Sequence, residues 1–180
     1  MRMFGPVLEG RVARLRPPRE ADLAVVMLWF EDLEVTRTLA AVLAPSEAGE
    51  REWFERAGKA QNQVSWLIEH EGRPVGTTGI VGIDWVNQRG STGIVLGDRA
   101  AWGKGIATEV MQLRTAFAFE QLNLHKLSSS YLDGNEASAR AQARAGYREI
   151  GRMRDHFFRD GRWLDEIITE VLREDWLRSR

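Results

Sequence analysis

The chain contains no cysteine and only three histidines among its 180 residues. The absence of cysteine excludes a disulfide framework, a cysteine nucleophile and a cysteine-based metal site. The scattered histidines give no metal-ligand spacing, so we expect no bound metal. No apolar run approaches the ~20 residues that a membrane-spanning helix needs, and no signal-like apolar stretch opens the chain. We therefore expect a cytoplasmic protein without a membrane partner.

The chain also lacks an excess of either charge, since it contains 25 Lys and Arg residues and 26 Asp and Glu residues. Near neutrality argues against general binding to nucleic acid or to anionic membranes. There is no long linker, low-complexity tract or internal repeat. A chain of 180 residues can bury a sizeable core. We therefore expect one domain over residues 1–180.

The most informative segment is WGKGIAT at residues 102–108, which lies between a strand-like run and a long helical pattern. Two glycines let the backbone turn and approach a ligand closely. The first N–H groups of the following helix have no internal partner and, with the helix dipole, favour a phosphate group. This arrangement predicts a phosphate-bearing cofactor, and a glycine turn without a ligand is the alternative.

Two well-known phosphate-binding motifs do not fit this segment. A P-loop needs four residues before its Gly-Lys pair, but five separate Gly97 from Gly103, and Gly105 takes the place of the hydroxyl residue. A dinucleotide-binding fingerprint needs a third small residue where Thr108 stands, within an early strand–helix–strand unit. We therefore exclude both an NTPase and a dinucleotide-binding domain.

A second motif follows the strand-like run at residues 125–133. Asn135 is a good N-cap, alternate alanines make a slim helix, and Gly146 is suited to close it. A slim helix can lie close to an elongated ligand, and an ordinary packed helix is the alternative.

Hydrophobic periodicity predicts a mixed α/β sheet with helices on both faces. The expected strands cover residues 12–16, 64–70, 74–85, 91–97, 125–133, 150–158 and 163–172. The expected helices cover residues 19–32, 46–60 and 104–122, with the slim helix after Asn135.

The segments LGDRAAWGKGIATEV, LNLHKLSSSYLDGNEASARAQARAGYREIG and DGRWLDEIITEVLREDW, with the opening GRVARLRPPREADL, resemble the GNAT acyltransferases. Within them, the chain is similar to the RimJ/RimL group of N-acetyltransferases over nearly its whole length. The resemblance implies an α/β fold with a mostly antiparallel mixed sheet of about seven strands. It further implies a splayed strand pair that holds acetyl-CoA.

The resemblance also implies which residues bind acetyl-CoA. The pantetheine is expected beside Val95, Leu96 and Gly97, where a backbone N–H could polarise the thioester carbonyl. The remaining cofactor residues are expected to be Trp102, Gly103, Lys104, Gly105, Ile106, Ala107, Thr108, Asn135 and Ser138. The chain departs from the family at Ala100, where Gln or Arg is common, and this departure leaves the backbone cradle intact.

Transfer to an amine requires an acid or hydrogen-bond donor for the departing thiolate. Alignment with the family puts Gln142 where many relatives have a tyrosine, and an amide cannot act as an acid. Ser138 is then the better candidate, and helix capping is the alternative role for this residue.

The same reaction requires a base, because an ammonium has no lone pair. Relatives often carry a glutamate where Thr92 stands. Asp84, at the end of a strand, is the first candidate, and His156 and Asp165 in the last hairpin are alternatives. For each of these residues, an ordinary surface hydrogen bond is the competing interpretation.

The resemblance therefore implies direct acetyl transfer to a primary amine on a small molecule or a protein N-terminus. The acceptor groove is expected to be built partly by residues 33–54, and four tryptophans are expected in the core or the cavity wall: Trp29, Trp53, Trp66 and Trp85. The competing hypothesis is a CoA-binding module without catalysis, since the usual tyrosine and glutamate are missing. A homodimer is compatible with the sequence.

Overall fold

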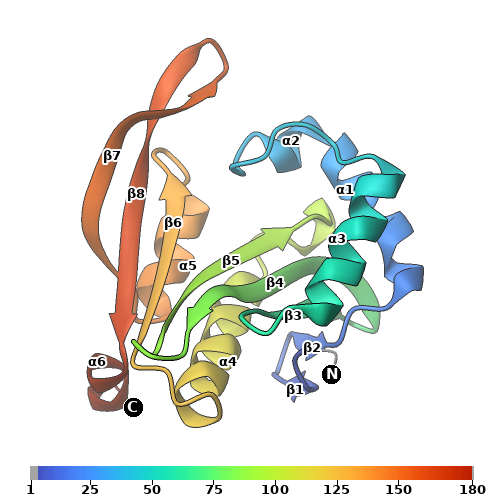
Figure 1. Cartoon of the computed structure of the whole chain (residues 1–180). Helices are drawn as coiled ribbons and strands as arrows, with labels where there is room; N and C mark the ends of the chain where they lie inside the picture. Colours follow the sequence, from blue (N-terminus) through green and yellow to red (C-terminus); the bar gives the residue numbers. More distant parts are fainter. Residues whose placement is uncertain (1–3, 180) are drawn as a thin grey trace.

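The computed structural model describes residues 4–179, which form one eight-stranded sheet with helices on both faces (Figure 1). The sheet runs in the order β1-β2-β3-β4-β5-β6-β8-β7, and β5 and β6 are its parallel pair. The strands are β1 (Leu8–Glu9), β2 (Arg14–Arg16), β3 (Val64–His70), β4 (Arg73–Asp84), β5 (Arg89–Leu96), β6 (Lys126–Leu132), β7 (Arg148–Arg159) and β8 (Arg162–Leu172). The expected fold class is confirmed. The expectation of about seven strands missed the two-residue β1.

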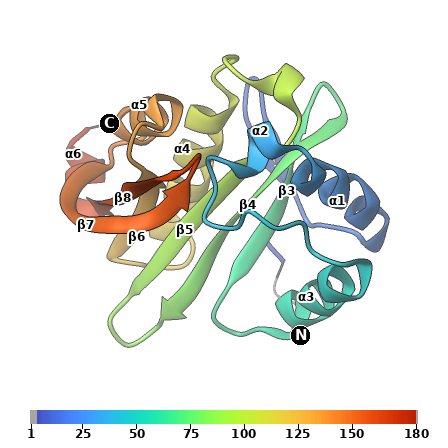
Figure 2. The same ribbon diagram turned by 90° about the horizontal axis from the view of Figure 1, so that it is seen from above.

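Six α-helices accompany the sheet in the described part of the chain. They are α1 (Leu23–Glu31), α2 (Leu33–Thr36), α3 (Glu47–Lys59), α4 (Ile106–Glu120), α5 (Glu136–Arg144) and α6 (Arg173–Arg178). Figure 2 shows α1 and α3 on one face of the sheet and α4 on the other. None of the helices within residues 4–179 is long and apolar enough to cross a membrane.

Strand β3 divides the core between these two faces, because successive side chains of a strand point in opposite directions. Trp66 and Ile68 belong to the larger cluster, which is shared with α4. Leu67 points the other way and packs with Val26 and Trp29 of α1. These three side chains of β3 are fully buried, so β3 contributes to the core on both faces of the sheet.

The local capping signals are met where the sequence placed them. The Ser46 hydroxyl accepts from the Gly49 amide at 3.1 Å and begins α3. The Asn135 side chain accepts from the Ser138 amide at 3.0 Å and begins α5, and Gly146 follows that helix at a positive φ of 89°. The expected first helix is divided, because a 3₁₀ turn (Glu20–Asp22) precedes α1.

The feature that creates the site is the divergence of β5 from β6. Their parallel pairing covers three residue pairs and ends at Ser91 and Ser128. One residue further, the Thr92 hydroxyl donates to the Ser128 carbonyl at 3.0 Å, and the Ser129 hydroxyl donates to the Thr92 carbonyl at 3.1 Å. These two bonds fasten the strands at the point where they separate.

Candidate active site

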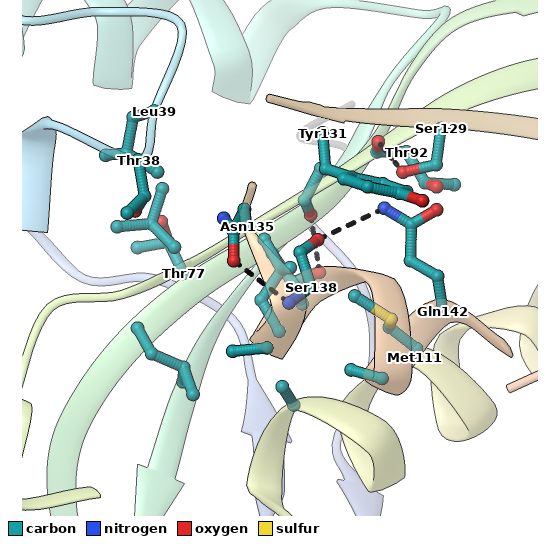
Figure 3. Close-up of a pocket in the computed structure, with 18 of the residues that line it drawn as sticks. Thr38, Leu39, Thr77, Thr92, Met111, Ser129, Tyr131, Asn135, Ser138 and Gln142 are labelled. Atoms are coloured by element: carbon teal, nitrogen blue, oxygen red, sulfur yellow. Dashed lines mark hydrogen bonds between the residues drawn. The ribbon is translucent and has the colours of Figure 1, made fainter. Parts of the chain in front are cut away.

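A cavity of about 840 Å³ lies where β5 and β6 separate. On one side it is lined by the glycine loop, the start of α4, and α5. On the other it is lined by the segment that joins α1 to α3 and by residues of the last hairpin. Figure 3 shows Ser138 and Gln142 on one side of this cavity, and Thr38 and Leu39 on the other.

The glycine loop has the backbone geometry that the sequence predicted. Gly103 and Gly105 have φ values of 75° and 80°, and a Cβ on either would meet no atom within 4 Å. Gly105 is the N-cap of α4, so the amides that follow it lack helical acceptors. The Trp102 indole donates to the Leu96 carbonyl at 2.9 Å and fastens the loop to β5.

The structure brings most of the loop residues to the cavity. Those of the predicted set that line it are Trp102, Gly103, Gly105, Ile106, Ala107 and Thr108. Lys104 does not line the cavity. Positive φ values, open space and free helix N–H groups together make the loop suitable for an anion.

The backbone groups of β5 that face the gap can be read from the hydrogen bonds of this strand. The Gly93 carbonyl accepts from Thr78 of β4, whereas the Thr92 carbonyl accepts from Ser129 of β6. Backbone groups alternate between the two edges of a strand. The amides of Ile94 and Leu96 therefore face the gap, and the backbone of Val95 faces β4, although Val95 still lines the cavity.

Gly97 lies outside the cavity lining, and its amide is already used. It donates to the Val75 carbonyl at 2.9 Å. A Cβ at Gly97 would lie 2.0 Å from the Trp29 ring. The glycine is thus required by the packing of Trp29, and the expected contact of the Gly97 amide with a ligand is not supported by this geometry.

Ser138 lines the cavity with its hydroxyl group free of any capping role. The cap of α5 is made by the Asn135 side chain. The Ser138 oxygen accepts from Gln142 Nε2 at 3.3 Å, which leaves the hydroxyl hydrogen available to a group in the cavity. Asn135 also lines the cavity.

Gln142 is buried and fixes the orientation of Ser138. Its Nε2 also donates to the Ser130 carbonyl at 3.2 Å, and its Oε1 accepts from the Thr169 hydroxyl. These bonds connect α5 to β6 and β8, so the amide is held from three sides. Gln142 therefore positions Ser138, as Figure 3 shows.

The structure separates Asp84 from the other candidates. Asp84 lies at the far end of β4, and its carboxylate accepts from the Val86 and Asn87 amides at 3.1 and 2.9 Å. Hydrogen bonds from the side chain and backbone of Asn87 lower the pKa of Asp84. The Asp84 carboxylate thus holds a turn outside the cavity lining, and its predicted role as the base has no support from this geometry.

The last hairpin contributes a different carboxylate from the predicted one. Asp165 accepts from the Asp155 amide and from Arg152, and these bonds lower the pKa of Asp165. The next residue, Glu166, points to the opposite face of β8, lines the cavity, and has a side chain that is 15% exposed. His156 lies 3.4 Å from Glu166. Sequence reasoning missed Glu166 by one position.

Tyr131 is a second residue that sequence reasoning missed. It lines the cavity on the same side as Ser138 and Gln142 (Figure 3). Burial and the nearby carboxylates of Glu149 and Asp133 raise the pKa of Tyr131. Its phenol is therefore neutral at pH 7 and has a proton to donate.

The tip of the last hairpin is bonded to the segment that forms one wall of the cavity. Arg159 Nη2 donates to the carbonyls of Leu39 and Ala40 at 2.6 and 2.9 Å. Arg37 forms an ion pair with Asp160 at 2.5 Å. Because Leu39 and Ala40 line the cavity, these contacts hold its wall in place across more than a hundred residues of sequence.

The four tryptophans have different surroundings. Trp53 and Trp66 line the cavity, and Trp29 is buried. Trp85 is 46% exposed, so the expectation of a core or wall position was wrong for this residue.

Charged side chains are few in the cavity lining of the described residues. Arg140 and Arg144 come from α5, and Glu166 comes from β8. The two arginines lie on the helix that follows the splayed strand, whereas the carboxylate lies in the hairpin. Within residues 4–179, no group of three or more His, Asp or Glu side chains could hold a metal ion.

Comparison with known proteins agrees with this geometry. The model of the Acetyltransferase (GNAT) domain matches residues 13–148. An uncharacterized N-acetyltransferase, p20 of Bacillus licheniformis, is 26% identical over 168 residues, which cover 90% of this chain and 93% of p20. A shorter match of 78 residues, 27% identical, covers 43% of this chain and 40% of the [ribosomal protein uS5]-alanine N-acetyltransferase of Escherichia coli (strain K12).

Among solved structures, the spermidine N-acetyltransferase of Vibrio cholerae in complex with CoA and spermine has a TM-score of 0.86. It is 18% identical, and the alignment covers 93% of this chain and 99% of that one. This likeness concerns the fold.

Proposed function

The chain belongs to the GNAT acetyltransferase family, and on that premise we propose that it transfers an acetyl group from acetyl-CoA to a primary amine. One observation carries the proposal. The anion-binding loop, the unpaired edge of β5 and the Ser138 hydroxyl all open into the same cavity. A glycine turn without a ligand would not explain why the unpaired edge of β5 and the Ser138 hydroxyl open into the same cavity.

The residues present fit acetyl-CoA. The amides after Gly105 would bind the pyrophosphate, and Thr108 would add a hydroxyl. The Ile94 carbonyl and the Leu96 backbone groups would pair with the pantetheine amides, which leaves the Ile94 N–H for the thioester oxygen. Arg140 and Arg144 provide positive charge on the same side of the cavity, which suits a ligand that carries several phosphate charges.

The acceptor would lie on the opposite side, between the hairpin and the α1–α3 segment. Glu166 is the carboxylate of that side, so it would attract an ammonium and take a proton from it, directly or through water. A small-molecule amine and a protein N-terminus both fit this chemistry. The similarity to the Escherichia coli enzyme favours the RimJ/RimL-like assignment and a protein acceptor.

The proposed step is direct. Glu166 takes the proton, and the amine lone pair forms the new N–C bond while the C–O π electrons move to oxygen, where the Ile94 amide donates a hydrogen bond. The nitrogen then loses its second proton to water, the C–O double bond re-forms and the C–S bond breaks. Ser138 passes its proton to the departing thiolate and is reprotonated from water, and Tyr131 is the alternative acid.

The test is thiol release measured with DTNB over a panel of small amines and N-terminal peptides, together with acetyl-CoA binding by calorimetry. Release that depends on the amine, with intersecting initial-rate lines, is the expected result. Parallel lines would indicate a covalent acetyl-enzyme instead. Tight acetyl-CoA binding without release for any amine would favour a CoA-binding module.

A further inference from the structure

Arg114 of α4 is a fully buried charge without a carboxylate partner. Its exposed fraction is 0%, and no ion pair joins it to an acidic side chain within residues 4–179. Its Nε and Nη2 atoms have no hydrogen-bond partner there. An uncompensated buried guanidinium is costly, so its presence in the core calls for a reason other than stability.

One nitrogen of Arg114 makes all of its hydrogen bonds. Nη1 donates to the Gly93 carbonyl at 2.7 Å and to the Thr78 hydroxyl at 2.6 Å. The Thr78 hydroxyl in turn donates to the same Gly93 carbonyl at 2.8 Å. The positive charge is thus directed, through two routes, at a single peptide oxygen of β5.

That peptide group spans the strand from one edge to the other. The described chain has no cis peptide bond, so the Gly93 carbonyl and the Ile94 N–H point in opposite directions. The carbonyl points to β4 and α4, and the N–H therefore points to the gap between β5 and β6. Pairing with β6 has already ended at Ser91, and Ile94 lines the cavity.

We infer that Arg114 is a positioning residue that polarises the Gly93–Ile94 peptide, which strengthens the Ile94 N–H as the donor to the thioester oxygen. A cation at the carbonyl oxygen draws electron density through the planar amide, and hydrogen bonds in series strengthen one another. The inference rests on the proposed function, because it needs a thioester carbonyl in the gap.

The test uses Arg114→Met, which keeps an unbranched apolar stem but removes the charged guanidinium. At saturating acetyl-CoA labelled with ¹³C at the carbonyl, and without amine, the infrared carbonyl stretch of the bound wild-type complex should lie below that of free acetyl-CoA. In Arg114→Met it should return toward the free value. With an acceptor, kcat should fall roughly 10-fold to 100-fold, since loss of a whole oxyanion donor costs about 10²–10³, with little change in acetyl-CoA affinity.

Stability should move in the other direction. Replacing an uncompensated buried charge with an apolar side chain is often neutral or stabilising, so the melting temperature of Arg114→Met should be equal or higher. Thr115→Val is the matched control, because Thr115 is the next buried residue of α4 and bonds to the Tyr147 hydroxyl. It should lower the melting temperature and leave the carbonyl stretch and kcat unchanged.

If Arg114→Met does not fold, Thr78→Val provides the second measurement. It removes the hydroxyl that links Arg114 to Gly93 and should raise the carbonyl stretch by a smaller amount. The inference would be overturned if Arg114→Met had the carbonyl stretch and kcat of the wild type. If only Thr78→Val folds, the same result in that variant would overturn it. A wild-type protein that binds acetyl-CoA with an unshifted carbonyl would also overturn it. Failure of the wild type to transfer to any amine, with a shifted carbonyl, would count against the proposed function alone.

Discussion

The two sides of the cavity are built in different ways. The side with the glycine loop comes from one continuous stretch, β5 to α5, and presents mainly backbone amides and helix ends. The other side comes from the α1–α3 segment and the last hairpin, more than a hundred residues apart, and presents side chains. A backbone site within one continuous segment can be recognised in the sequence from the spacing of its glycines and helix-capping residues. A site built from side chains of distant segments has no such spacing, because folding brings its residues together.

The largest expected effect lies on the side-chain side. Glu166→Gln keeps the shape but removes the base, so kcat/KM for the amine should fall about 10²–10³-fold, within the usual range for general base catalysis. Steady-state kinetics would measure the fall, and calorimetry should find the acetyl-CoA affinity unchanged. Asp165→Asn, one residue away on the other face of β8, is the control and should stay within a few-fold of wild type.

Loss of the Ser138 hydroxyl should have the next largest effect. Ser138→Ala should lower kcat about 10-fold to 100-fold, below or at the lower end of acid catalysis, with an almost unchanged melting temperature. Asn135→Ala should show the opposite pattern, because it removes the cap of α5 and costs about 1 kcal/mol. Unchanged kcat in Ser138→Ala would transfer the role of acid to Tyr131, which Tyr131→Phe would then test.

A smaller effect should distinguish two glycines of similar backbone conformation. Gly105 and Gly146 have φ values of 80° and 89°, so Ala at either position should cost about 1–2 kcal/mol of stability. Gly105→Ala alone should also weaken acetyl-CoA binding, by roughly 10-fold for about 1.4 kcal/mol. If the two variants bind acetyl-CoA with equal affinity, the glycine loop is not part of the acetyl-CoA site.

The smallest effect on activity is expected at Glu109 of α4, whose carboxylate accepts from the amides of Arg11, Val12 and Ala13. Burial opposes ionisation, but these three bonds prevail and lower the pKa of Glu109. Its contribution to stability is therefore complete above the ordinary pKa of a glutamate, about 4.3, and is lost as pH falls below it. Urea unfolding should find Glu109→Gln less stable than wild type at pH 7, with the difference shrinking below about pH 4. An undiminished difference there would contradict this account, and kcat should stay the same.

Local signals in the sequence predicted the fold well because they act over short distances. The strand over residues 64–70 matches β3, and Ser46 and Asn135 cap the helices that they were expected to cap. Helix α3 ends at Lys59 with Ala60 as its C-cap, which matches the expected helix over residues 46–60. Short elements such as β1 and α2 carry too few residues for a periodic pattern.

Several predicted site residues lie elsewhere than the sequence led us to expect, for physical reasons that depend on the folded structure. Whether Asp165 or Glu166 faces the cavity depends on the phase of β8, and β7 beside it has register shifts. Gly97 looked like a ligand-binding glycine, but it accommodates Trp29, which is distant in sequence. Asp84 does end a strand, yet it pairs with Arg89 at the start of β5, whereas the cavity is lined by the end of β5.

The short pairing of β5 with β6 makes the sheet incomplete by design. Two half-sheets, β1 to β5 and β6 to β8, are joined by three residue pairs and a few hydroxyl bonds. An extended ligand with amides along its length would serve as the missing strand and join the halves. The stability of the junction between the two half-sheets would then depend on how much of the protein has ligand bound. Amide hydrogen exchange along β5 and β6 should slow as acetyl-CoA is added, so the backbone itself would report how full the site is.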